Sequence, residues 1–317
     1  MALHLVTGGA GFIGSHITER LLSEGSDVRV VDDFSTGRQE NLEFVPASDR
    51  WGRLEVIPGD ITDAAVARRM MKDVDIVFHQ AAIPSVPRSV ADPAASNEAN
   101  VTGTLNLLVA ARDAKVSRFV YASSSSVYGE SPTLPKREDM PPEPLSPYAI
   151  SKLAAELYAR AFTRIYRLPT IGLRYFNVFG PRQDPASEYA AVVPNFLNTM
   201  ARGQRPTIYG DGQQTRDFTF VSNAVDANMA AVRCGEQAFG GAYNVACGQR
   251  VSLLELVSRI NALLGSSLAP AHTAPRPGDV MHSLADVSLA ASRLGFTPAV
   301  DLDEGLARTA AWFRKKS

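Results

Sequence analysis

The sequence is poor in cysteine, shows no excess of charge of either sign and has no long apolar run. Two cysteines, Cys234 and Cys247, occur in 317 residues, and they have neither metal-ligand spacing nor a disulfide framework. The net charge is −1, so the basic footprint of a nucleic-acid-binding protein is missing. No apolar run reaches the roughly 18 residues of a membrane span, and we expect no signal peptide, because the first residues already resemble a strand. These absences favour a globular cytoplasmic protein with no metal and no membrane partner. The length of the chain suits one large domain or two modest ones.

What the sequence does contain, at its very start, is a glycine cluster directly after an apolar run. Leu3–Thr7 leads into Gly8, Gly9, Gly11 and Gly14, and an apolar-periodic helix follows. In this context the glycines permit a tight turn, a close backbone approach to a pyrophosphate and close packing of helix on strand. The helix N-terminus then favours the anion. The pattern predicts a dinucleotide site that is made by Gly8, Gly11, Phe12, Ile13 and Gly14.

An acidic residue stands at the distance that this motif requires. Val28–Asp32 reads as the second strand, and Asp32 follows Gly14 by eighteen residues. A carboxylate there accepts from both ribose hydroxyls and repels a 2′-phosphate, which favours NAD over NADP. Two alternatives remain: Asp32 and Asp33 only open a turn, or Arg38 meets a 2′-phosphate.

Strands and helices alternate through the first half of the chain. This alternation predicts an α/β fold, a Rossmann-type doubly wound parallel sheet. Beyond residue 175 prolines interrupt shorter elements, which indicates a smaller mixed α/β lobe. We therefore expect a cofactor domain over 1–175, to which later segments return, and a substrate lobe over 176–317. The further strands are expected at Leu54–Pro58, Val74–His79, Arg118–Ala122 and Thr170–Arg174, and the helices at Ala64–Lys72, Asn100–Ala114, Tyr148–Tyr166, Val193–Arg202, Ala224–Val232, Leu253–Leu264 and Leu302–Trp312.

Two further segments follow strands at the edge where a parallel sheet binds ligands. Asp60 would accept from an adenine amino group while Ile61 packs on the ring; alternatively Asp60 caps the helix that begins near Thr62. Gln80, Ala81 and Ala82 supply small residues at the end of another strand.

A tyrosine and a lysine four residues apart carry the chemistry. Tyr148 and Lys152 follow Ser146 and Pro147, which suit the cap and first position of a helix, and the spacing places them on one face. A phenol titrates near 10, so a working base at pH 7 needs roughly 4 kcal/mol of preference for phenolate. A cation about 6 Å from the phenolate, in an effective dielectric near 20, stabilises it by roughly 2.8 kcal/mol before desolvation, so two such cations suffice. Lys152 and an oxidised nicotinamide are the obvious pair. The alternative is an exposed helix face, and the run Ser123–Ser126 leaves the choice of a helper hydroxyl open.

The chain strongly resembles the extended short-chain dehydrogenase/reductase family over nearly its whole length. The resemblance rests on the glycine turn, Asp32, Gly59-Asp60, His79–Ala82, Asn100-Val101, Ser124, Tyr148–Lys152 and Arg174–Val178. Within that family it looks like the nucleotide-sugar 4-epimerases, and Ser85–Ser89 and Tyr189–Pro194 resemble those that act on N-acetylated UDP-hexosamines. Some glucose/galactose epimerases have a lysine shortly after the small-residue turn, where this chain has Ile83-Pro84. The resemblance therefore does not say which residue contacts the cofactor there.

The resemblance implies residue roles. Ser124, Tyr148 and Lys152 match the catalytic Ser/Thr, Tyr and Lys: the phenolate takes the 4-hydroxyl proton while C4 gives hydride to NAD, and the hydride returns to the opposite face of the turned 4-keto sugar. Ser125 and Ser126 stand where 4,6-dehydratases have an Asp-Glu pair and decarboxylases a glutamate, which favours the epimerase. A non-catalytic NAD sensor commonly lacks the Tyr/Lys pair. The implied NAD contacts are Gly8, Gly11, Phe12, Ile13, Gly14, Asp32, Asp33, Phe34, Ser35, Gly37, Asp60, Ile61, Gln80, Ala81, Ala82, Asn100, Ser123, Tyr148, Lys152 and Tyr175.

The same resemblance implies a UDP-sugar site and a homodimer. Arg216 and Arg276 match phosphate-binding arginines, Asp279 a ribose contact, and Ser283 a gate at which a small residue leaves room for a 2-acetamido group. Family dimers pair two helices per subunit, here near Asn100–Asp113 and Ala149–Phe162. The implied substrate contacts are Ser85, Arg88, Ser124, Ser125, Tyr148, Asn177, Val193, Ile208, Tyr209, Arg216, Arg276, Asp279 and Ser283.

Overall fold

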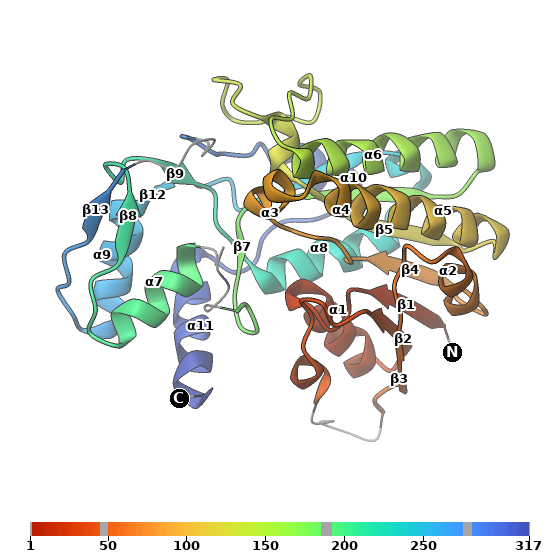
Figure 1. Ribbon diagram of the computed structural model, residues 1–317, viewed down its shortest axis with the longest axis horizontal. Helices are drawn as coiled ribbons and strands as arrows, with labels where there is room; N and C mark the ends of the chain where they lie inside the picture. Colours follow the sequence, from red (N-terminus) through yellow and green to blue (C-terminus); the bar gives the residue numbers. More distant parts are fainter. Residues whose placement is uncertain (1, 45–49, 185–191, 275–280, 317) are drawn as a thin grey trace.

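A seven-stranded parallel sheet forms the centre of the computed structural model, which describes residues 2–44, 50–184, 192–274 and 281–316. The strand order is β11-β6-β5-β4-β1-β2-β3 (Figure 1), and each neighbouring pair is parallel. The order reverses between β1 and β4, and in such sheets the crevice at that point binds ligands. The strands are β1 (Leu3–Thr7), β2 (Asp27–Asp32), β3 (Leu54–Pro58), β4 (Ile76–His79), β5 (Arg118–Ser124), β6 (Thr170–Tyr175) and β11 (Ala242–Val245).

Helices cover both faces of this sheet, because its strands are apolar on both sides. On β1, Leu5 belongs to one apolar cluster and its neighbour Val6 to the other, and both are fully buried. The predicted doubly wound α/β fold is therefore confirmed. One face carries α1 (Phe12–Ser23), α8 (Val221–Arg233) and α10 (Ser288–Leu294), and the other carries α2 (Ala64–Met70), α5 (Gly103–Asp113) and α6 (Pro147–Tyr166).

The helical stretch before α5 begins earlier than predicted. The expected helix over Asn100–Ala114 is preceded by α3 (Val86–Ala91), α4 (Pro93–Asn97) and a π-helical turn at Glu98–Thr102. Pro87 and Pro93 lie in the first turns of α3 and α4, where a missing N–H costs nothing. These prolines therefore fit the starts of the two helices.

A smaller lobe lies beside the sheet and has its own apolar core (Figure 1). Phe179, Phe196, Ile208 and Leu256 are buried in this core. The segments α8, β11 and α10 pack in the main domain although they come late in the chain. The lobe is built from α7 (Val192–Ala201), α9 (Leu253–Leu264), α11 (Leu302–Lys316), and the strand pairs β7 (Val178–Phe179) with β10 (Thr219–Phe220), β8 (Thr207–Tyr209) with β13 (Ala271–Thr273), and β9 (Thr215–Arg216) with β12 (Val251–Ser252).

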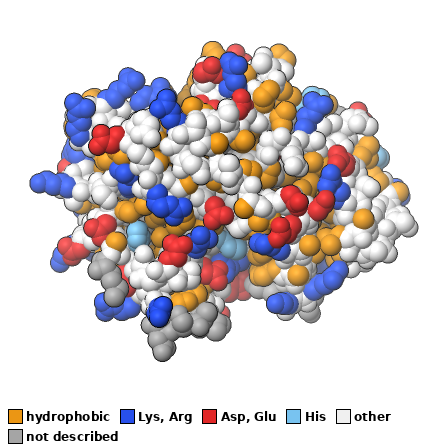
Figure 2. All heavy atoms as spheres, turned by 180° about the vertical axis from the view of Figure 1, so that it is seen from behind, with side chains coloured by type: hydrophobic (Ala, Val, Ile, Leu, Met, Phe, Trp, Pro, Cys, Tyr) orange, Lys and Arg blue, Asp and Glu red, His pale blue; other side chains and the backbone are white. Residues whose placement is uncertain are grey.

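Surface charge is mixed on the face opposite to that of Figure 1. Figure 2 shows Lys and Arg side chains interspersed with Asp and Glu. Within the described residues no helix has the length and apolarity to cross a membrane, and no group of three or more His, Cys, Asp or Glu in that part of the chain is arranged to hold a metal ion.

Candidate active site

The glycine turn after β1 is held against the neighbouring strand ends. Gly8 has a φ of +67°, and a Cβ there would lie 2.6 Å from the Ala81 nitrogen. A Cβ on Gly14 would lie 2.1 Å from the Gly8 carbonyl oxygen. Both positions therefore require glycine, one for its backbone angle and both for the close approach.

The N-terminus of α1 leaves donors for an anion. Gly11 is the N-cap and provides no side chain to accept a hydrogen bond, and the first turn has no acidic residue. The first N–H groups of any α-helix lack intrahelical partners, so those of Phe12 and Ile13 suit a pyrophosphate. The residues present fit a dinucleotide.

Asp32 ends β2 beside this turn and is 7% exposed. Its Oδ2 accepts from the Ala10 N–H at 2.9 Å and its Oδ1 from the Phe34 N–H at 2.9 Å. Burial raises the pKa of this carboxyl, while a carboxylate keeps lone pairs for further donors such as ribose hydroxyls. A Cβ on Gly37 would lie 2.6 Å from Oδ1, so the following loop closes tightly over Asp32.

The residues after Asp32 are engaged with one another. Asp33 accepts from the Ser35 N–H and hydroxyl at 2.9 and 2.7 Å. The Arg38 guanidinium contacts Asp184 at 2.5 Å and Glu40 at 3.4 Å. This arginine, the candidate for a 2′-phosphate, is thus turned toward two carboxylates.

Asp60 and Ile61 lie at the end of β3. Asp60 accepts from the Thr62 N–H at 2.8 Å, but the N-cap of α2 is Asp63. The alternative in which Asp60 caps this helix is therefore wrong, and the adenine contact stays a prediction. Ile61 is 7% exposed and packs on Gly103 of α5.

Polar side chains fix the turn that follows β4. Gln80 accepts from the Tyr175 hydroxyl at 3.3 Å, and Asn228 donates to that hydroxyl at 2.7 Å. Asn100, within the π-helical turn, accepts from the Ile83 N–H at 2.8 Å and donates to the Ser151 hydroxyl at 3.0 Å. The half-buried Ala81 and Ala82 are thus held between β6, α8 and α6.

Tyr148, Lys152 and Ser124 come together where β5 ends and α6 begins. Ser146 caps α6 by accepting from the Ala149 N–H at 3.1 Å, which sets Tyr148 in the first turn. The Lys152 Nζ lies 5.9 Å from the centroid of the Tyr148 ring and donates to the Ala122 carbonyl at 3.0 Å. Burial lowers the pKa of Lys152 to about 8. Burial also raises the pKa of Tyr148, which a hydrogen bond with Ser124 opposes.

Ser126 completes this arrangement. The Ser124 Oγ accepts from the Ser126 N–H at 3.2 Å and from the Ser126 hydroxyl at 2.9 Å. With two donors on its oxygen, Ser124 is left to donate its own proton to Tyr148, and such a bond favours phenolate. Sequence reasoning did not find this role, because four adjacent serines are indistinguishable until the 3₁₀ turn at Ser125–Tyr128 orients them.

The neighbouring Ser123 belongs to a buried ionic network. Its hydroxyl donates to Glu156 at 2.5 Å, and Arg174 holds both Glu156 oxygens at 2.8 and 2.9 Å. Arg174 also donates to the Tyr128 hydroxyl at 2.8 Å. Glu156 lies one turn beyond Lys152 on α6, so the network ties the end of β5 to the catalytic helix.

The other residues near the sheet that are predicted to contact the substrate differ in how deeply they are buried. Ser85 caps α3 by accepting from the Arg88 N–H at 3.2 Å, and Arg88 is exposed. Ser125 is half-buried beside Ser124. Asn177 has a φ of +35° and donates to the Asp217 carbonyl at 3.0 Å.

Two of the candidates in the lobe, Arg216 and Ser283, lie on or beside β9. Arg216 lies on β9, and the Ser283 N–H donates to the Thr215 carbonyl at 3.0 Å. Ile208 is fully buried in the lobe core, whereas Tyr209 is 37% exposed. Val193 is 1% exposed on α7. Arg276 and Asp279 lie outside the described residues.

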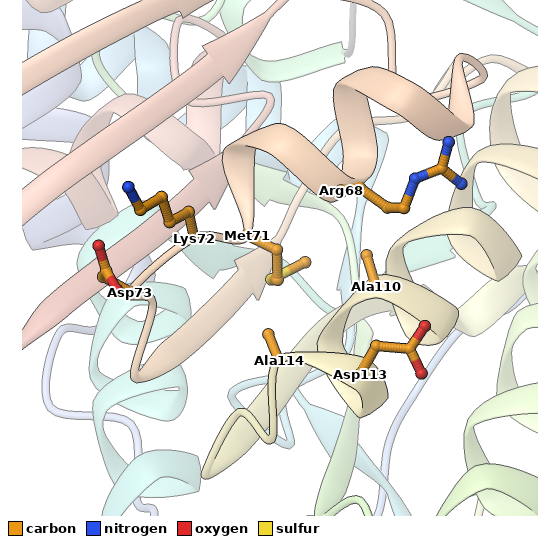
Figure 3. Close-up of a pocket in the computed structure, with 7 residues that line it drawn as sticks. All are labelled: Arg68, Met71, Lys72, Asp73, Ala110, Asp113 and Ala114. Carbon is orange, nitrogen blue, oxygen red and sulfur yellow. The ribbon is translucent and has the colours of Figure 1, made fainter.

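A hollow at the other end of the sheet contains none of these residues. Figure 3 shows it between the C-terminal parts of α2 and α5, where β4 and β5 begin. Its side chains are mostly charged and point in different directions (Figure 3). It is lined by Arg68, Met71, Lys72, Asp73, Ala110, Asp113 and Ala114.

Comparisons with known proteins agree with this geometry. Residues 4–246 match the NAD dependent epimerase/dehydratase family. The chain is 43% identical to a UDP-glucose 4-epimerase of Mycolicibacterium smegmatis over 316 residues, covering 99% of both chains. A UDP-N-acetylglucosamine 4-epimerase from Methanobrevibacter ruminantium in complex with UDP-N-acetylmuramic acid superposes with a TM-score of 0.93, 40% identity and coverage of 100% and 99%. A Thermus thermophilus UDP-glucose 4-epimerase in complex with NAD gives a TM-score of 0.88, 37% identity and coverage of 99% and 100%. This chain belongs to the NAD-dependent epimerase/dehydratase family and is an NAD-dependent epimerase.

Proposed function

We propose that the enzyme inverts C4 of a UDP-hexose, and that UDP-GlcNAc and UDP-GalNAc are its substrates. The observation that carries the reaction type is the meeting of Tyr148, Ser124 and Lys152 at the same end of the parallel sheet as the glycine turn. UDP-glucose and UDP-galactose are the alternative pair, and the names of the relatives include both classes.

The chain's own residues handle the proton. Bound NAD supplies the hydride acceptor and donor at C4. Tyr148 takes the 4-hydroxyl proton. Ser124 bridges the sugar hydroxyl and the phenol once the Ser126 hydroxyl turns away and frees a lone pair on the Ser124 oxygen. Because burial raises the pKa of Tyr148 in the protein alone, the phenolate depends on positive charge nearby, which Lys152 supplies in part.

The serine turn argues against water loss or decarboxylation. Ser125 and Ser126 occupy the positions where those reactions would use carboxyl groups. Unlike a carboxyl group, a serine hydroxyl does not act as an acid or a base at neutral pH. Ser126 is also engaged with Ser124. The Tyr148/Lys152 pair likewise argues against a non-catalytic NAD sensor.

UDP recognition falls to the lobe in this proposal. We assign NAD binding mainly to residues 1–175 and UDP-sugar binding mainly to 176–317. Arg216 and Arg276 would hold the diphosphate, since a guanidinium can grip phosphate oxygens bidentately. Asp279 would accept from the uridine ribose. We also propose that the enzyme is cytoplasmic.

The direct test is incubation with UDP-GlcNAc and, separately, UDP-glucose without added NAD, followed by chromatographic separation of the 4-epimers. Conversion of the acetylated sugar supports the full proposal. Conversion of UDP-glucose alone supports the alternative pair. Conversion of neither sugar, with or without added NAD, contradicts C4 epimerisation of these sugars.

Substrate choice depends on Ser283, which is half-buried. In Ser283→Tyr the ring would fill space for the 2-acetamido group, and overpacking costs about 1–3 kcal/mol. We expect kcat/KM for UDP-GlcNAc to fall about 10- to 100-fold, with UDP-glucose changed less than about threefold. Ser292→Tyr, at an exposed position on α10, is the matched control. Unchanged turnover of the acetylated sugar would remove the gate.

We also propose a homodimer that pairs α5 and α6, the two helices expected at Asn100–Asp113 and Ala149–Phe162. Ile150, Leu157, Tyr158 and Ile165 are 55%, 54%, 40% and 69% exposed along this helix, and an apolar stripe of this kind marks an interaction surface. Val90 of the adjacent α3 is 64% exposed. A second copy can cover the same stripe isologously.

Light scattering after size exclusion tests this dimer. Leu157→Glu is expected to give a monomer at micromolar concentration, because it buries a charge on both sides of the two-fold axis. Met281→Glu, which alters a residue that is 57% exposed in the lobe, should leave the dimer intact. A monomeric wild type, or a dimeric Leu157→Glu, would refute the interface.

A further inference from the structure

A fully buried carboxylate joins the loops of the substrate lobe. Asp217 lies between β9 and β10 and is 0% exposed. Its Oδ1 accepts from the Cys247 N–H at 3.0 Å, and its Oδ2 accepts from the N–H groups of Gly248 and Ala285 at 3.1 Å each. One side chain thus binds backbone from two loops that are far apart in sequence.

Backbone dipoles, not a cation, compensate this charge. No ion pair among the described residues includes Asp217. Burial raises the pKa of its carboxyl to about 6, and the hydrogen bonds from backbone N–H groups oppose that rise. Gly248 has a φ of +68°, and alternation into the left-handed region turns successive N–H groups toward one anion. The carboxylate and this nest of donors therefore depend on each other.

Three of the proposed substrate contacts lie beside Asp217. Asn177 donates from its side chain to the Asp217 carbonyl, and Arg216 is the preceding residue. Ala285 lies two residues beyond Ser283, which is itself bonded to β9 through the Thr215 carbonyl. The proposed contacts to the diphosphate, the sugar and the 2-acetamido group therefore all lie close in the structure to one residue, Asp217.

We propose that Asp217 is a positioning residue for the UDP-sugar, an inference that rests on the proposed function. Its carboxylate holds the loops at 247–248 and 285 against β9 and so sets Ser283 relative to Arg216, while its backbone carbonyl holds the Asn177 side chain. It acts on binding and not on chemistry, because it contacts none of Tyr148, Lys152 and Ser124. A role in folding alone would lower stability without changing affinity.

Asp217→Asn keeps the shape of the side chain but turns one acceptor into an NH2 group that faces N–H donors. We expect KM for the UDP-sugar, and the Kd of UDP by calorimetry, to rise at least tenfold, with kcat within about threefold and bound NAD retained. Asp75→Asn is the control: the exposed Asp75 also accepts from a backbone N–H, that of Leu3 at 2.8 Å, but at the N-terminal ends of β1 and β4.

Gly248→Ala probes the same nest without altering the carboxylate. A methyl group there would have its nearest neighbour at 3.8 Å, so the disturbance is backbone strain. We expect a rise of about threefold or more in the Kd of UDP. Gly265→Ala is its control, since Gly265 has a φ of +66° and open space around it at the end of α9.

The outcomes separate the two hypotheses. Weaker UDP binding in Asp217→Asn and Gly248→Ala, with both controls unchanged, supports the inference. Equal loss of thermal stability in Gly248→Ala and Gly265→Ala, with unchanged UDP affinity in the folded Asp217 and Gly248 variants, overturns it. If Asp217→Asn does not fold, the two glycine variants decide. A wild type that does not bind UDP contradicts the proposed function instead.

Discussion

Tyr148→Phe is expected to lower kcat for 4-epimerisation by about 10²–10⁴-fold, which is the range of a lost general acid–base group. The substitution removes one oxygen and keeps the ring beside Lys152. Neither the glycine turn nor Asp32 is touched, so NAD should remain bound at the wild-type stoichiometry. The measurement is initial rate with the UDP-sugar that the wild type converts, with NAD quantified after denaturation of the protein.

Tyr166→Phe serves as the matched control for this variant. Tyr166 ends the same helix and is 47% exposed, so loss of its hydroxyl should leave the rate within about twofold. Retention of a tenth or more of kcat in Tyr148→Phe would show that another group moves the proton. Loss of NAD together with activity would place Tyr148 in cofactor binding and leave its role in proton transfer without support.

The sheet could be predicted because each strand is short, apolar and followed by a helical period. The predicted strand Leu54–Pro58 and the predicted helix Leu253–Leu264 have the same bounds in the structure. Periodicity fails where an element has no pattern of its own. β11 has four residues, all buried, and one of them is the polar Asn244, so the sequence shows no apolar run there.

Residues that act through distant partners could not be found in this way. Glu156 looks like any glutamate of a helix until Arg174 is placed beside it. Asp217 gives no signal either, because its donors are backbone groups at 247, 248 and 285. Motifs indicate groups that meet ligands, whereas the groups that position them become visible only with tertiary contacts.

Arg174→Met is expected to lower the free energy of unfolding by about 3–5 kcal/mol, because it leaves a buried carboxylate without its partner. The side chains of Arg174 and Glu156 are 5% and 1% exposed, so water cannot replace the lost bonds. Urea denaturation followed by circular dichroism measures the change. Adding Glu156→Leu should recover part of the loss, since two apolar side chains can replace a buried pair at little cost.

Arg259→Met is the control for the pair at Arg174. Arg259 binds Glu255 and Asp303 at 2.6 and 2.7 Å, but these side chains are 34–64% exposed, and surface pairs contribute about 0–1 kcal/mol. If Arg174→Met costs no more than this control, the buried network does not fix the end of β5. The other outcome is a large loss, with the double variant recovering stability but not kcat. That result would show that the network of Ser123, Glu156 and Arg174 positions Ser124 and Lys152 for catalysis, because stability can be restored without it.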